Sequence, residues 1–243
     1  MALVRRQIAT TPHARVFKTF ALTCILYFSL AFGANEWSPV IFNNTAPSSR
    51  MMHTNTLLNL APCGGLTLMF GGIINTSSPV FEFTNETWIF RIETNSYVQV
   101  LGVEKAPTPR AGHTAVLIGD SAYIFGGYDQ SSAKRDVWFF RQPSCDGSYM
   151  SNSWVSVDYA CDDNCPAPRW GHSAIAYNNN MLVHGGSGSP WLYCNIEGLP
   201  VIDDGLWLFD TELLRWTHLL IAAVPRPAPR MGSGECIYLS RAR

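Results

Sequence analysis

The sequence predicts an all-β fold made of repeated four-stranded antiparallel sheets. Three observations lead to this prediction: short apolar segments separated by turn residues, intervals between them that are too short for crossover helices, and landmarks that recur about every 60 residues. The clearest unit runs from Pro107 to Trp154, where four such segments follow one another. We expect each segment to pair with its neighbour in the sequence, because consecutive strands usually lie side by side.

The landmarks keep one order in every unit. An arginine opens the unit, a histidine lies three residues later, a glycine doublet ends the second strand, and a large aromatic lies in each of the last two strands. The arginines are Arg50, Arg110, Arg169 and Arg230, and the histidines are His53, His113 and His172, with Ser233 in the fourth unit. The doublets are Gly71-Gly72, Gly126-Gly127 and Gly185-Gly186. The aromatics are Trp88, Trp138 and Trp207 in the third strand, and Trp37, Tyr97, Trp154 and Trp216 in the last.

This order of residues resembles the kelch repeat of β-propellers, over residues 37 to 243. The resemblance implies a kelch-type propeller segment with three four-stranded blades, at about residues 50–97, 110–157 and 169–217. Residues 37–42 and 230–239 would supply the terminal strands of a fourth blade. Closed propellers generally have four to eight blades, so we expect an incomplete ring whose end blades expose apolar faces.

Residues 1–33 predict a secretory signal peptide ahead of a propeller segment at 34–243. Four basic residues up to Lys18 precede an uncharged stretch, and Ala31 and Gly33 supply the small residues of a cleavage site. About 15 apolar residues are short against the ~20 that span a bilayer. The prediction is a secreted protein with no membrane span after signal removal, and the alternative is a membrane anchor formed by an uncleaved signal.

Export agrees with two further features. Asn43, Asn75 and Asn85 each begin a glycosylation sequence, and six cysteines remain after Cys24 leaves with the signal. Cys161 and Cys165 predict a disulfide-pinned loop rather than a cation site, because the segment offers too few oxygens for calcium. Cys145 is a candidate partner of either one, although six cysteines allow 15 pairings.

Composition and motifs argue against several functions. A charged fraction of 14% and a net charge of −1 give no field that would attract nucleic acid or an anionic membrane. No nucleophile turn, zinc motif or phosphate loop occurs. We interpret the three repeat histidines as hydrogen-bonded within their own blades rather than as metal ligands, and His184 as a partly buried residue with one partner. We therefore expect no cofactor and no catalytic site.

The leading hypothesis is a glycosylated scaffold that binds an extracellular protein or a glycan through its loops. In type it looks most like the kelch regions of attractin-like extracellular proteins. The alternative is a fragment of a copper-radical sugar oxidase of the galactose-oxidase-like kind, although the crosslinked cysteine and tyrosine of such enzymes are not identifiable. Trp191 and Tyr193 are the candidate ligand-binding residues, since they lie in the long loop of blade three that no predicted glycan covers. Both could instead fold back onto the blade.

Overall fold

The computed structural model describes residues 41, 45–58, 65–75, 81–141, 153–161, 165–188 and 205–220. The chain divides into two compact units, Met1–Ile41 and Phe42–Arg243, and every strand described below belongs to the second. Within the described ranges all regular elements are β-strands. None of these residues lies in a helix that is long and apolar enough to span a bilayer.

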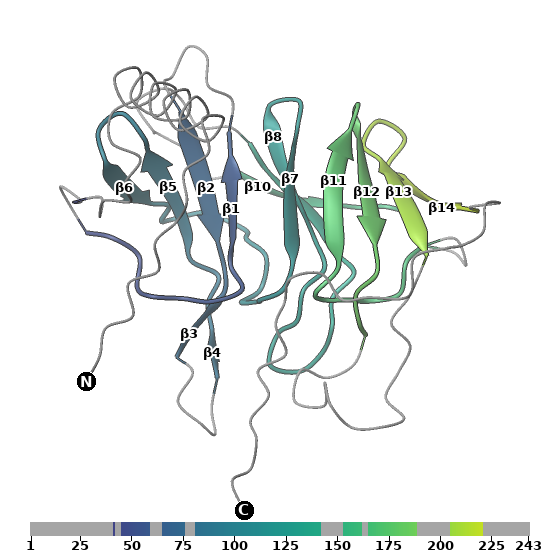
Figure 1. Cartoon of the computed structure of the whole chain (residues 1–243), viewed down its shortest axis with the longest axis horizontal. Helices are drawn as coiled ribbons and strands as arrows, with labels where there is room; N and C mark the ends of the chain where they lie inside the picture. Colours follow the sequence, from purple (N-terminus) through teal and green to yellow (C-terminus); the bar gives the residue numbers. More distant parts are fainter. Residues whose placement is uncertain are drawn as a thin grey trace, which may run out of the picture. The chain divides into compact units, whose positions relative to one another are not determined.

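Twelve of the strands form three antiparallel four-stranded sheets, which we call blades one, two and three (Figure 1). Blade one has the order β1-β2-β5-β6, with β1 (Thr54–Leu57), β2 (Leu66–Phe70), β5 (Thr87–Arg91) and β6 (Ser96–Gln99). Blade two has β7 (Thr114–Ile118), β8 (Ser121–Phe125), β9 (Val137–Arg141) and β10 (Trp154–Val157). Blade three has β11 (Ser173–Tyr177), β12 (Asn180–His184), β13 (Leu206–Asp210) and β14 (Arg215–Leu219).

These sheets confirm the predicted all-β fold of three four-stranded blades in a segment that is not closed into a ring. Blade one carries an extra hairpin between its second and third strands, made of β3 (Ile73–Asn75) and β4 (Glu82–Phe83), which the sequence reasoning did not anticipate. The terminal strands expected at 37–42 and 230–239 lie outside the described residues, apart from Ile41, which is not in a strand.

Each blade packs on the next through one face of its sheet. We call the face toward the preceding blade the leading face and the face toward the following blade the trailing face. Between blades one and two the core contains Leu68, Phe70 and Ile89 on the trailing side with Ala122, Ile124, Phe140 and Trp154 on the leading side. Between blades two and three it contains Val116, Phe125 and Val137 with Met181, Val183, Phe209 and Trp216. The repeated aromatics therefore fill the space between neighbouring sheets, as expected.

The first strands of the blades lie next to one another, with β7 in contact with both β1 and β11 (Figure 1). The glycine doublets allow this approach. Gly127 has φ +97°, and its amide donates to the carbonyl oxygen of Arg169 in the next blade at 2.9 Å. Gly72 makes the same bond to Arg110 at 2.8 Å. A side chain at either glycine would be strained, because L residues seldom adopt so positive a φ.

Candidate functional site

The connections between the second and third strands of each blade are the candidate binding surface. The strands run antiparallel in the same order in all three blades, so these connections leave the sheets at corresponding ends. They span the β3–β4 hairpin in blade one, Tyr128 to Arg135 in blade two, and the segment after Gly186 in blade three. We call them the 2–3 connections.

A separate small core supports the 2–3 connections. Ile73, Ala111, Tyr128 and Trp170 are buried together, one or more from each blade, and Phe81, Phe83 and Ala133 pack against them. Backbone bridges join Ala111 to Tyr128 and Trp170 to Ser187, which ties each connection to the start of a first strand. The base of the candidate surface is therefore an ordered, packed structure rather than a set of independent loops.

The blade-two connection is held by Asp129. Its carboxylate accepts hydrogen bonds from the amides of Ser131 at 2.8 Å and Ser132 at 2.9 Å, and it forms an ion pair with Lys134 at 2.5 Å. Burial alone would raise the pKa of Asp129, but Lys134 and the two amides outweigh it and lower the pKa to about 2. Gln130 reaches across to blade one, where its Nε2 donates to the carbonyl oxygen of Phe81 at 3.3 Å.

The longest 2–3 connection, in blade three, carries the predicted ligand-binding residues Trp191 and Tyr193. Both lie in the segment 189–204, which is outside the described residues. The structure describes the two ends of this segment, Ser187 and Gly188 on one side and Gly205 before β13 on the other. Ser187 is buried and bridged to Trp170, so the connection starts from the supporting core. Trp191 and Tyr193 stay predictions.

The repeat arginines are structural. The Nη1 atom of Arg110 donates to Gly126 O at 3.1 Å, and its guanidinium forms a two-point ion pair with Asp136 at 2.6 and 2.8 Å. Burial alone would raise the pKa of Asp136, but the hydrogen bonds and charge of Arg110 lower it. Arg50 repeats the arrangement with Gly71 O and Glu86, and Arg169 bonds Gly185 O at 2.8 Å.

Two of the three repeat histidines, His113 and His172, join blades, which corrects for them the prediction that the repeat histidines bond within their own blade. The Nε2 atom of His113 is hydrogen-bonded to Thr54 Oγ1 of blade one at 2.9 Å, and that of His172 to Thr114 Oγ1 of blade two at 2.8 Å. Each ring also packs edge-on against the last aromatic of the preceding blade's second strand, Phe70 or Phe125. The sequence prediction failed because a three-residue offset from an arginine does not show which sheet the ring faces.

These histidines are held in the neutral form. Burial and the charge of Arg169 lower the pKa of His172 to about 3, and burial and the charge of Arg110 lower that of His113 well below its ordinary value. His53 is shifted in the same direction by burial and Arg50. Among the described residues, no group of three or more His, Cys, Asp or Glu side chains is placed to hold a metal ion.

The sequence reasoning missed two kinds of partner residue. The hydroxyl that meets each histidine belongs to Thr54 or Thr114, the residue directly after the preceding blade's histidine. The acid that meets each arginine is Glu86 or Asp136, two residues before the third-strand tryptophan. In blade three the position that matches Asp136 is Gly205. Both signals were visible in the sequence as His-Thr pairs and as an acid at a fixed place before Trp.

Two of the three predicted glycosylation sites, Asn75 and Asn85, belong to blade one. Asn85 lies in the turn between β4 and β5 with an exposed side chain, and its Nδ2 is 3.5 Å from Pro107 O. Asn75 is the last residue of β3. Asn43 lies outside the described residues. Glycosylation at these three asparagines stays a prediction.

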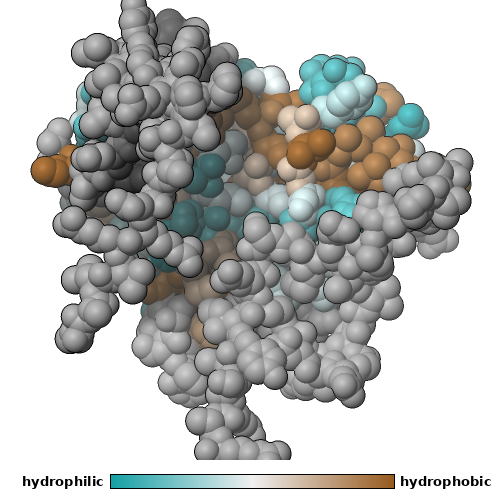
Figure 2. Space-filling view, in the orientation of Figure 1, coloured by the Kyte–Doolittle hydropathy of each residue, from teal (hydrophilic) through white to brown (hydrophobic). Residues whose placement is uncertain are grey.

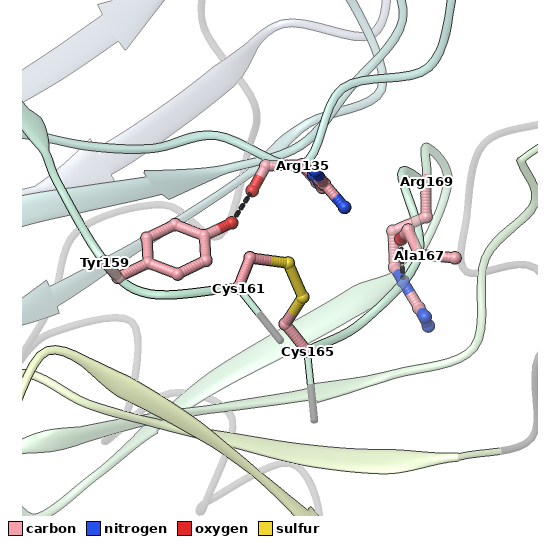
Figure 3. Close-up of a disulfide and its surroundings, with 6 residues drawn as sticks. All are labelled: Arg135, Tyr159, Cys161, Cys165, Ala167 and Arg169. Atoms are coloured by element: carbon pink, nitrogen blue, oxygen red, sulfur yellow. Dashed lines mark hydrogen bonds between the residues drawn. A yellow bond between two sulfur atoms is a disulfide. The ribbon is translucent and has the colours of Figure 1, made fainter. Parts of the chain in front are cut away.

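A disulfide joins Cys161 to Cys165 beside the start of blade three (Figure 3). Their Cα atoms are 5.5 Å apart, within the range that a disulfide spans. Figure 3 shows the hydroxyl of Tyr159 directed at the backbone oxygen of Arg135, to which it donates a hydrogen bond. This pairing forms the pinned loop and differs from the bridge to Cys145 that the sequence also suggested. Cys145 lies outside the described residues.

Comparison with known proteins identifies the repeat. A family model described as the KLHDC2/KLHL20/DRC7 Kelch-repeats domain matches residues 22–144 and 58–241. The chain is 30% identical over 153 residues to Rho GTPase-activating protein gacHH of Dictyostelium discoideum, covering 60% of this chain and 9% of that protein. It is 28% identical over 172 residues to Tip elongation aberrant protein 3 of Schizosaccharomyces pombe, covering 62% and 14%. It is 26% identical over 197 residues to human Host cell factor 2, covering 74% and 23%. The matched region is thus less than a quarter of each of these relatives.

Proposed function

Because the chain belongs to the kelch-repeat family, we propose that it is a secreted, glycosylated scaffold that binds an extracellular protein through its 2–3 connections. The observation that carries this proposal is the shared core of Ile73, Ala111, Tyr128 and Trp170. It fixes the bases of all three connections relative to one another. Binding residues on loops held by a rigid β scaffold can present a continuous surface without a large ordering cost.

The chemistry of the described residues favours binding over catalysis. The buried arginines Arg50 and Arg110 are committed to ion pairs with acids of their own blade, and His113 and His172 are neutral and committed to threonines of the neighbouring blade. A general acid or base needs a pKa near the working pH and access to a substrate, and neither histidine has these properties.

The binding test replaces both Trp191 and Tyr193 with alanine in the full chain expressed in a secretory host. We expect unchanged secretion and at least tenfold weaker binding of the labelled chain to cell surfaces, since aromatic anchors often dominate interface energetics. The matched control is Leu213→Ala, in the exposed turn between β13 and β14 and outside the 2–3 connections, which should bind as the unaltered chain does.

Two results would contradict the binding proposal. Reduced secretion of the double variant, with normal binding by the recovered protein, would show that the aromatics belong to the core. Binding that survives protease treatment of the cells but not glycosidase treatment would assign a glycan in place of a protein.

The export proposal has its own readout. Treatment of the secreted chain with an N-glycosidase should lower its mass, and Asn85→Gln should remove one glycan from it. Retention of the chain inside the cells in unglycosylated form would refute export while leaving the binding test valid.

A further inference from the structure

The trailing face of blade three has the pattern of a buried blade face but is exposed. On β11 the side chains of Ile175 and Tyr177 are 61% and 58% exposed. Val116 and Ile118 occupy the same positions on β7 of blade two, where blade three covers them to 7% and 6% exposure. Figure 2 shows hydrophobic residues at the surface in the region where Figure 1 draws β11 and β12.

The register shows how far this face extends across the sheet. Ile175 pairs with Leu182, which pairs with Leu208, and directly paired residues share one face of an antiparallel sheet. The next row places Ser173 beside His184 and Leu206. Ser173 stands where Thr114 stands in blade two, and His184 where Phe125 stands.

The two blade boundaries within the chain show which side chains cover a trailing face. At both described blade boundaries, a histidine from the following blade reaches a hydroxyl at the start of the first strand. At both, an aromatic from the following blade's last strand packs on the aromatic that ends the second strand: Trp154 on Phe70 at 4.9 Å, and Trp216 on Phe125 at 4.7 Å between ring centroids. The partner of a trailing face is therefore the leading face of a blade that carries both side chains.

Blade one has such a leading face. His53 is the repeat histidine that has no preceding blade among the described residues, and it has no described counterpart of the threonine contacts that His113 and His172 make with the preceding blade. Tyr97 on β6 holds the position of Trp154 and Trp216, paired with Phe90 as Trp154 is with Phe140. On β1 the side chain of Leu57 is 46% exposed, and Asn55 on the same face is exposed as well.

We propose that the trailing face of blade three binds the leading face of blade one of a second copy of this chain. The contact is centred on β11 of one copy and β1 of the other, the strands that carry the exposed side chains of the two faces. Met69 on β2 and Trp88 on β5 share this face with Asn55. Both are already buried in the single chain, so the proposed contact does not use them. His53 of one copy would meet Ser173 of the other, as His172 meets Thr114 within the chain.

The contact is heterologous, because two different faces meet. The described part of each copy has one face of each kind, so such contacts either close into a ring or continue as an open chain. A ring uses both faces of every copy, and an open chain uses both faces of every copy except the two at its ends. This requirement distinguishes the proposal from a symmetric contact in which two β11 strands face each other.

Sedimentation of the purified full chain over a hundredfold range of concentration tests the proposal. We expect the mass to rise above that of a monomer as the concentration rises. Ile175→Asp with Tyr177→Asp should weaken association at least tenfold by placing charges in the contact, and Leu57→Asp should do the same from the other side. Leu213→Asp is the matched control, since Leu213 is 60% exposed in the turn between β13 and β14 and should leave association unchanged.

Mixing the two defective variants is the decisive measurement. The Leu57→Asp copy retains its blade-three face and the Ile175→Asp, Tyr177→Asp copy retains its blade-one face, so the mixture should form pairs that neither variant forms alone. If Asp at these sites alters the circular dichroism spectrum, Ser replacements serve instead. A chain that stays monomeric at every concentration, a mixture that fails to pair, or a Leu213→Asp variant as defective as the others would each overturn the proposal.

Discussion

Alanine at Gly126 should destabilise the fold in two ways: through strain in the left-handed backbone and through overlap of the new Cβ atom with the next blade. Comparison with alanine at Gly119 separates the two effects. Gly126 has φ +65°, and Gly119, in the β7–β8 turn, has φ +60°. An alanine at either position pays about 1–2 kcal/mol for the left-handed backbone. A Cβ at Gly119 would meet nothing within 4 Å, whereas a Cβ at Gly126 would lie 2.6 Å from Arg169 O and 3.0 Å from His172 Cε1.

The overlap at Gly126 therefore lowers the free energy of unfolding further. Both neighbours belong to blade three, and the oxygen is a backbone atom that cannot rotate away, so the boundary must shift. Overpacking of this kind costs about 1–3 kcal/mol. We expect Gly119→Ala to lower the free energy of unfolding by about 1–2 kcal/mol and Gly126→Ala by about 2–5 kcal/mol. Alanine also restricts the unfolded chain, but equally in both variants, so this effect cancels in the difference.

Urea unfolding followed by tryptophan fluorescence would measure both values, because Trp154 and Trp216 lie at the blade boundaries. Equal destabilisation by the two substitutions, within about 0.5 kcal/mol, would refute the argument, since that is the usual scatter between independent sites. Such a result would mean that blade three does not pack closely against the glycine doublet of blade two.

Three further outcomes follow from the same contacts. Asp136→Asn leaves the buried guanidinium of Arg110 without its charge partner and should lower the free energy of unfolding in urea by about 2–3 kcal/mol. This is less than the ~3–5 kcal/mol of a fully buried pair, because Asp136 is 38% exposed. The control Asp120→Asn, in an exposed turn, should lower it by less than about 0.5 kcal/mol, and equal losses in the two variants would contradict the expectation. The lowered pKa of His172, about 3, means that the unfolded chain binds a proton below pH 6.5 that the folded chain does not, so stability should be full above pH 6.5 and fall as the pH is lowered toward 3. The loss should approach about 1.4 kcal/mol per pH unit for this residue, and melts of His172→Gln should show a shallower acid dependence; an unchanged slope would refute the assignment. Non-reducing mass mapping should recover one peptide closed by Cys161 and Cys165, whereas a peptide that links either of them to Cys145 would show a different pairing.

Much of the fold could be predicted because its signals are local. Strand periodicity and the spacing of Arg110, Gly126 and Trp138 mark the strands within one sheet, and the structure has those strands. The β3–β4 hairpin escaped because its second strand is two residues long, Glu82 and Phe83, which is too short to show any alternation. The role of His113 and His172 escaped because it depends on the contact between two sheets. A linear pattern says which residues recur but not which neighbour they touch. Trp191 and Tyr193, chosen from loop length and composition, stay a prediction.

The hydroxyl and histidine contacts between blades have a consequence for how such a chain changes in evolution. Each of the three described units contains both residues of such a contact, a histidine and, directly after it, a hydroxyl residue: Thr54, Thr114 or Ser173. A tandem duplication of the unit therefore inserts a blade whose two joints already fit, without any compensating mutation. A substitution in one half, by contrast, is felt by the adjoining unit, so the histidine of one repeat and the threonine of the repeat before it are expected to change together. The number of blades can therefore change more easily in evolution than the residues that connect neighbouring blades.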